Sequence, residues 1–164
     1  MDSQDRVTQK LADFAKLWLA HDGLWFQVVE EKYGLDAAIE LDKAAWFQFS
    51  PIEAKRIMTR LGIEEGGGLQ ALVKALPERL YAELNEQEII EAGEKRVVFV
   101  MKSCRVQEAR RRRKLAPFPC KEVGIVEYSR FASTIDPRIR TKCLRCPPDD
   151  YKGEFWCAWE FTEE

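Results

Sequence analysis

The sequence predicts an α+β fold, with N-terminal helices followed by an antiparallel sheet of two hairpins with intervening helices. In residues 1–76, apolar side chains recur every three or four positions, which is typical of amphipathic helices. In residues 77–164, alternating and β-branched apolar segments indicate strands. A chain of 164 residues, 46% of them hydrophobic, is long enough for one domain with its own core and too short for two. We therefore expect residues 1–164 to form a single domain, with a helical part at 1–76 and an α+β part at 77–164.

The helical part opens with an apolar stripe that runs from Arg6 to Tyr33. The polar sequence His21-Asp22-Gly23 interrupts this stripe, and glycine costs about 1 kcal/mol in a helix interior, so the segment forms one kinked helix or two. Gly34 is expected to end it, and Asp36 is expected to cap the helix that follows.

Ser50-Pro51-Ile52-Glu53 has the pattern of a helix start: a capping residue, proline at the first helical position and an acid at the third. We therefore expect a new helix from Pro51 to about Leu61. The glycine-rich segment 64–68 lacks the lysine that ends a phosphate-binding loop, so it is interpreted as a linker. A short helix over residues 69–76 follows, and Pro77 ends it.

The α+β part begins with a predicted hairpin. Residues 80–85 alternate between apolar and polar, and residues 97–101 are apolar on both faces, as in a central strand. A helix that continues through Ala82 is the alternative for the first of these segments. The remaining predicted elements are two helices and a pair of strands, at Cys104–Lys114, Cys120–Phe131, Arg138–Cys143 and Glu154–Phe161.

Charge and composition limit the classes of partner. The 26 basic and 28 acidic side chains leave a net charge of −2, which argues against broad electrostatic binding to nucleic acid or to an anionic membrane. The polar N-terminus has no signal-peptide core and no window is apolar enough to span a membrane, so we expect a cytoplasmic protein. The basic run from Arg110 to Lys114 is interpreted as a solvated helix face, with contact to a nucleic acid or an anionic ligand as the alternative.

Four of the five cysteines lie in residues 117–161, and Cys143 and Cys146 form a C-x-x-C motif. If the last two strands pair antiparallel, Cys157 is carried back toward that motif. Cys120 adds a thiol at a helix start, where the helix dipole favours the thiolate. In a reducing compartment such a cluster indicates a metal site that holds Zn²⁺ or an iron–sulfur cluster, with zinc preferred. The alternative is that Cys120 and Cys157 are small buried hydrophobic residues and that the C-x-x-C motif is a tight turn.

Outside the cysteine cluster, few residues indicate a chemistry. His21 is the only histidine, and neither a G-x-S-x-G nor an H-E-x-x-H motif is present. His21 and Asp22, with Trp25 one helical turn further on, are candidates for lining a ligand pocket, and a solvated helix kink is the alternative. Cys104 is expected in the core. An exposed aromatic face would be able to form a homodimer.

Several short motifs together resemble the 4-vinyl reductase domain, over residues 69–161. They are a hairpin followed by Phe118-Pro119-Cys120 at a helix start, Gly124-Ile125-Val126-Glu127, Thr141-Lys142-Cys143 at a strand end, and Trp156-Cys157-Ala158-Trp159-Glu160-Phe161. The same clan includes proteins similar to L-2-amino-thiazoline-4-carboxylic acid hydrolase, and more remotely the small-ligand domains of nitric-oxide-signalling and Golgi-transport proteins. The resemblance implies a ligand-binding fold with a three-cysteine site thought to hold metal, carried here by Cys120, Cys143 and Cys157. Cys146 would close the fourth position of that site.

The whole chain also resembles a family of cytosolic proteins of anaerobic bacteria and archaea to which no activity is assigned. The similar runs are LWLAHDGLWFQVVEEKYG, SPIEAKRIMTRLGI, RLYAELNEQEI and VGIVEYSRFASTIDPRIRTKC. We therefore expect a cytosolic, metal-stapled domain that binds or senses a small molecule. The alternative, implied by the amino-thiazoline hydrolase resemblance, is a hydrolase of a small heterocyclic or amide substrate that uses His21 and Asp22.

Overall fold

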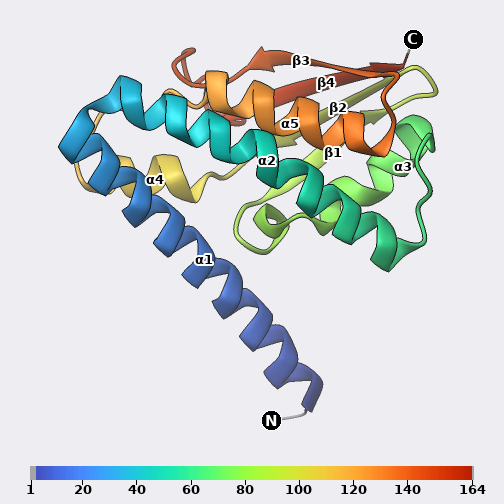
Figure 1. Cartoon of the computed structure of the whole chain (residues 1–164), viewed down its shortest axis with the longest axis horizontal. Helices are drawn as coiled ribbons and strands as arrows, with labels where there is room; N and C mark the ends of the chain where they lie inside the picture. The colour runs from blue at the N-terminus through green and yellow to red at the C-terminus, as the bar shows by residue number, and fades with distance from the viewer. Residues whose placement is uncertain (1–2, 164) are drawn as a thin grey trace.

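A computed structural model describes residues 3–163, and these residues form the expected α+β fold (Figure 1). Helices α2 and α5 lie side by side, α5 packs on a four-stranded sheet, and α1 projects away from this body toward the N-terminus. The elements in chain order are α1 (Ser3–Tyr33), α2 (Leu35–Leu61), α3 (Gly68–Ala75), the short 3₁₀ helices η1 (Leu76–Glu78) and η2 (Leu80–Glu83), β1 (Gln87–Ala92), β2 (Arg96–Met101), α4 (Arg105–Arg112), α5 (Lys121–Ile135), β3 (Ile139–Arg145) and β4 (Cys157–Glu163).

The sheet is antiparallel throughout, with strand order β1-β2-β4-β3. The predicted pairing of the last two strands is confirmed, and it places Cys143 opposite Trp159. The first predicted strand is wrong, because residues 80–85 form 3₁₀ turns and β1 begins only at Gln87. The physical reason is tertiary: Tyr81 packs its ring against Trp18 and Trp46 in the helical layer, which removes this segment from the sheet.

Helix α1 runs without a break through His21-Asp22-Gly23, so the two-helix alternative is wrong. The single glycine therefore does not end the helix. The packing of α1 on α2 offsets the low helix propensity of Gly23. Gly34 ends α1 as predicted, in a positive-φ conformation (φ 88°) that glycine adopts without strain. Asp36 is no cap: α2 starts at Leu35, and its N-cap position is Gly34 without any side-chain cap bond.

The predicted helix start at Ser50-Pro51 is also wrong, because α2 continues through it from Leu35 to Leu61. Ser50 is buried, and its hydroxyl donates back to the Trp46 carbonyl at 2.8 Å instead of capping. Proline has no N–H, so Pro51 cannot donate a helical hydrogen bond to the carbonyl four residues earlier, that of Phe47. Arg130 of α5 donates its Nε to that oxygen at 3.4 Å, so a neighbouring helix supplies what Pro51 cannot.

Helix α5 approaches the sheet closely where Tyr128 stacks on Trp159, with ring centroids 4.6 Å apart. Gly124 permits this approach, because a Cβ atom at that position would lie 2.6 Å from the Trp159 ring. The main core fills the space between α5, α2, α3 and the central strands. Its larger fully buried side chains are Trp159, Phe99, Phe131, Phe161, Leu69, Leu72 and Leu76.

A second, smaller core joins the helices. Trp18 of α1 packs edge-on against Trp46 of α2 and stacks on Phe49 of the same helix. Phe26 of α1 packs edge-on against Phe118. The N-terminal half of α1 lies beyond this contact and exposes apolar side chains, among them Val7, Leu11, Phe14 and Leu17. The homodimer expected from exposed aromatic surface stays a prediction, as does the single-domain organisation.

A charged triad is buried between α2, η2 and α5. Arg79 is 2% exposed, and it donates to Glu53 at 2.9 Å and to Glu127 at 2.7 Å. Glu53 also accepts the Leu80 amide at 3.1 Å, and the guanidinium lies over the Phe131 ring at 4.6 Å. The sequence does not predict this triad, because Glu53 fits the pattern of a helix start at Ser50-Pro51.

The basic run is not a uniformly solvated face. Arg110 is buried, and its guanidinium binds the Glu30 carboxylate of α1 and the Ala116 carbonyl. Arg113 donates to Gln27 of the same helix. These contacts hold α4 against α1, while the expectation of no nucleic-acid partner stays a prediction. Among the described residues, no helix is long and apolar enough to cross a membrane.

Candidate functional site

Four cysteines are brought together where one end of the sheet meets the start of α5. Cys143 and Trp159 are paired across β3 and β4, and Cys157 lies two residues before Trp159, so all three side chains share the sheet face. The register of β3 shifts between Cys143 and Arg145, and Cys146 follows directly where the strand ends at Arg145. Cys120 is the N-cap residue of α5, the helix that packs on this face.

Cys146 is the centre of this thiol cluster, which we define as Cys120, Cys143, Cys146 and Cys157. Its side chain is 1% exposed, whereas the other three are partly exposed. The sulfur atoms of Cys120 and Cys146 are 3.4 Å apart, in hydrogen-bonding contact. The sequence-predicted candidates are thus brought together from three segments of the chain.

The thiols differ in how readily they lose a proton. Hydrogen bonds with Cys120, Cys143 and Cys157, together with burial, raise the pKa of Cys146 far above its usual range. A hydrogen bond from Cys146 lowers the pKa of Cys143, and the nearby Lys121 ammonium lowers it further. Within the cluster, Cys143 therefore loses its proton more readily than Cys146 does.

The loop after Cys146 is fastened to the first turn of α5. The Lys121 amide donates to the Pro147 carbonyl at 2.9 Å, and the Lys121 ammonium pairs with Asp149 at 2.6 Å. Asp149 also accepts the Cys146 amide at 3.2 Å. On the other side, Gln107 of α4 contacts the Cys120 sulfur at 3.5 Å. These bonds fix the position of the cluster relative to the sheet.

The donor set suits a soft metal ion, since four cysteine sulfurs are a ligand set typical of structural Zn²⁺ and of iron–sulfur clusters. Sulfur atoms in tetrahedral zinc sites lie about 3.8 Å apart, given Zn–S bonds of about 2.3 Å. The 3.4 Å between Cys120 and Cys146 is close to that separation. The sulfurs nevertheless gather around Cys146 rather than around a common centre. Accordingly, no three or more His, Cys, Asp or Glu side chains in the described part of the chain form a ready metal site.

Cys104 lies at the N-cap of α4, and burial raises the pKa of its thiol to about 12. The neighbouring sulfurs of Cys120 and Cys157 raise this pKa further, so the fifth cysteine lies near the cluster. Its side chain is only partly buried and belongs to none of the hydrophobic core clusters of the described residues, so the core position expected from the sequence is not confirmed.

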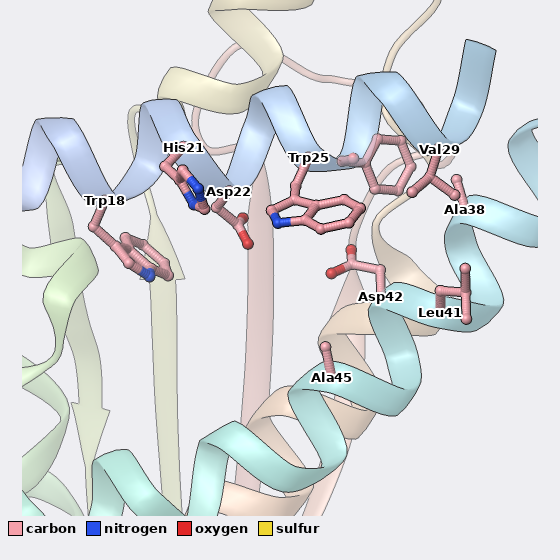
Figure 2. Close-up of a pocket in the computed structure, with 10 residues that line it drawn as sticks. Trp18, His21, Asp22, Trp25, Val29, Ala38, Leu41, Asp42 and Ala45 are labelled. Carbon is pink, nitrogen blue, oxygen red and sulfur yellow. The ribbon is translucent and has the colours of Figure 1, made fainter. Parts of the chain in front are cut away.

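A pocket of about 310 Å³ lies between α1 and α2 (Figure 2). It includes all three residues predicted from the sequence, His21, Asp22 and Trp25, on the α1 side. The full lining is Trp18, His21, Asp22, Trp25, Phe26, Val29, Ala38, Leu41, Asp42 and Ala45. The sequence analysis missed Asp42, although it lies on one helical face with Ala38 and Ala45, a spacing that could have marked it.

The two pocket carboxylates are held partly out of water. Burial raises the pKa of Asp22, although the adjacent His21 partly offsets this. Burial also raises the pKa of Asp42 to about 7, and the negative charges of Asp22 and Glu127 add to that shift. Asp42 therefore titrates near neutral pH.

The glycine-rich segment between α2 and α3 lies beside a second hollow of about 300 Å³. Protein carboxylates already accept the amides at the start of α3: Asp136 binds the Gly68 amide at 3.0 Å and Glu163 binds the Leu69 amide at 3.4 Å. These bonds favour the interpretation of the segment as a connection.

Fold and sites together define an α+β domain with a thiol cluster at the sheet end and a pocket between its first two helices. The chain belongs to a family of unknown function, DUF6125, which matches residues 1–163. No curated protein and no solved structure matches the chain. Nothing in these comparisons links it to the 4-vinyl reductase domain or to the amino-thiazoline hydrolase clan, and that resemblance stays a prediction.

Proposed function

We propose that the protein is a small-molecule-binding or sensing domain whose sheet end is stapled by one metal centre at Cys120, Cys143, Cys146 and Cys157. The observation that carries the proposal is the convergence of three thiols, from β3, β4 and the start of α5, on the buried sulfur of Cys146 in the loop between the two strands. The cytoplasmic location expected from the sequence stays a prediction.

A metal bound by four thiolates has no open position, so its chemistry is structural: it ties separate segments together and adds its binding energy to folding. Zinc is preferred, and an iron–sulfur cluster is the alternative. The thiols must lose their protons and rearrange to bind it. Lys121 and the N-terminus of α5 supply positive charge beside the resulting thiolates.

The test is elemental analysis and an absorbance spectrum of protein purified without oxygen. We expect about one zinc per chain, no visible absorption, and a lower melting temperature after chelation. Cys146→Ser should lose the metal, whereas the matched control Cys104→Ser should keep it. The proposal fails if native protein contains neither zinc nor iron and Cys143→Ser melts like wild type. Iron with a broad visible band would instead favour redox sensing.

The small-molecule half of the proposal is supported by the pocket between α1 and α2. Ligand sites are mostly apolar hollows of roughly 300–1,000 Å³ with a few convergent polar groups. This pocket has aromatic and aliphatic walls and two carboxylates.

One observation favours a hydrolase as a second candidate. The pKa of Asp42, about 7, is suited to a general base at neutral pH, and His21 and Asp22 lie in the same lining. Any turnover found in a screen of small amides and heterocycles should then be lost in Asp42→Asn and in His21→Ala. Turnover that survives both substitutions would exclude this assignment of residues.

A further inference from the structure

We infer that the pocket between α1 and α2 binds a small organic cation, an ammonium group carried on an apolar body, between the carboxylates of Asp22 and Asp42. This inference rests on the small-molecule half of the proposed function. It names the chemical class of the ligand and is independent of the metal.

The aromatic wall is the first argument. Trp18, Trp25 and Phe26 line the pocket from α1, and Figure 2 shows the Trp25 ring lying in the space between the two helices. Trp25 is 60% exposed, so its ring is available to a ligand. The face of an indole ring attracts organic cations, most strongly those with weakly hydrated ammonium groups.

The second argument is the charge of the lining. Asp22 comes from α1 and Asp42 from α2, so the carboxylates face the pocket from its two walls (Figure 2). No lysine or arginine belongs to the lining, and His21 is its only basic residue. In residues 3–163, neither carboxylate takes part in a salt bridge, and Lys43, next to Asp42, is paired with Glu40 and Glu122 instead.

The third argument is the buried charge of Glu53, Arg79 and Glu127, which acts on the pocket through space. Arg79 is bound by both Glu53 and Glu127, so this triad carries one negative charge more than positive when both acids are ionised. The negative charge of Glu127 repels the pocket carboxylates: it raises the pKa of Asp42, and Asp22 in turn raises the pKa of Glu127. A bound cation would relieve this repulsion.

These features also separate an organic cation from other ligands. An anion would be repelled by both carboxylates. Magnesium requires six closely arranged oxygen ligands and keeps several waters, which apolar and aromatic walls do not favour. An ammonium group on an apolar body uses the carboxylates and the rings together.

The experiment is isothermal titration of the full-length protein with two matched pairs of probes. Each pair contains an ammonium compound and a neutral compound of the same shape: choline with its carbon isostere, and phenethylamine with phenethyl alcohol. We expect at least one ammonium probe to bind about tenfold more tightly than its neutral partner, or better. Asp22→Asn and Asp42→Asn should each remove most of that difference. Asp36→Asn removes a carboxylate of α2 that lies outside the pocket, so it should leave the difference in affinity between the ammonium and neutral probes unchanged.

The pH dependence is a second readout. The charge of choline does not change with pH, so any pH dependence of its affinity belongs to the protein. Affinity should rise as pH is raised through about 7, where Asp42 ionises, and this rise should disappear in Asp42→Asn.

Each outcome decides the inference. If the neutral partners bind as tightly and the asparagine variants behave like wild type, the pocket takes a small molecule but not as a cation. In that case the inference is overturned and the proposed function stands. If neither ammonium probe binds, the inference is overturned, while metal analysis still decides the staple separately. Circular dichroism melts of both asparagine variants confirm that they are folded.

Discussion

The thiol cluster and the pocket both hold ionisable groups away from water, but they do so in opposite ways. In the cluster, the buried sulfur of Cys146 lies among the sheet, α5 and a fastened loop, and the three partly exposed cysteines hydrogen-bond to it. In the pocket, two like-charged carboxylates face each other across a hollow that only two helices line. In the first region the groups bind mainly one another, whereas in the second Asp42 keeps a hydrogen bond with Trp46 and Asp22 lies beside His21, and neither carboxylate has a salt-bridge partner among the described residues.

The difference follows from the secondary structure that surrounds each region. Strands paired in register, with a helix packed on their face, bring residues from distant parts of the chain to one enclosed point. Helices α1 and α2, joined by the single residue Gly34, pack along one line of contact, and the pocket beside it is lined by residues of these two helices alone. Closed regions of this kind suit a staple, and open ones suit exchange of a ligand.

Arg79→Met should produce the largest effect, because Arg79 is buried and binds the carboxylates of both α2 and α5. It leaves Glu53 and Glu127 buried without a counter-charge, and breaking a buried ion pair in this way typically costs about 3–5 kcal/mol. Urea unfolding measures the loss. Arg56→Met, at an exposed position of α2, is the control and should change stability by less than about 0.5 kcal/mol. An equal effect of both substitutions would contradict the role of the triad.

Replacing glycine by alanine in each region should give opposite signs. Gly124→Ala places a Cβ atom 2.6 Å from the Trp159 ring beside the sheet, and overpacking of this kind costs about 1–3 kcal/mol. Gly23→Ala lies in α1 beside the pocket lining, where a Cβ atom meets nothing within 4 Å, so it should gain about 1 kcal/mol from helix propensity. Thermal melts of both variants compare the two regions directly. Two changes of the same sign would show that both are packed alike.

The smallest effect concerns pH and the open pocket. The folded-state pKa of Asp42, about 7, lies above its ordinary value of 3.8, so the folded protein binds this proton more tightly than the unfolded chain does. Stability should therefore increase as pH falls from about 7 toward about 4, and Asp42→Asn should remove that contribution. Because Asp42 is partly exposed, the contribution should be roughly 1 kcal/mol or less. Denaturant titrations at several pH values measure it, and an unchanged slope in the variant would contradict the assignment.

The spacing of apolar residues predicted the secondary structure correctly wherever residues close in the chain determine it. The helices α3, α4 and α5, the buried strand β2 and the pairing of β3 with β4 were predicted closely. The approach of Cys157 to Cys143 and Cys146 also followed from the predicted strand pairing and side-chain alternation, whereas Cys120 joins them through the packing of α5 on the sheet. The stop at Gly34 followed from the freedom of glycine to take positive φ.

Local pattern failed where a distant segment supplied the missing interaction. Ser50-Pro51 reads as a helix start, yet the helix continues because Arg130 donates to the carbonyl that proline leaves unsatisfied. Residues 80–85 alternate like a strand, yet the packing of Tyr81 on Trp18 and Trp46 draws them into the helical layer.

The sequence alone therefore determined the fold class, most of the elements and the gathering of the cysteines, because periodicity and register depend on residues close in the chain. Only the tertiary structure decided that Glu53, Arg79 and Glu127 form a buried triad and that Asp42 faces Asp22 across a pocket. These charges come from different helices, and their energies depend on burial and on distances through space. Neither quantity is encoded in the spacing of residues along the chain.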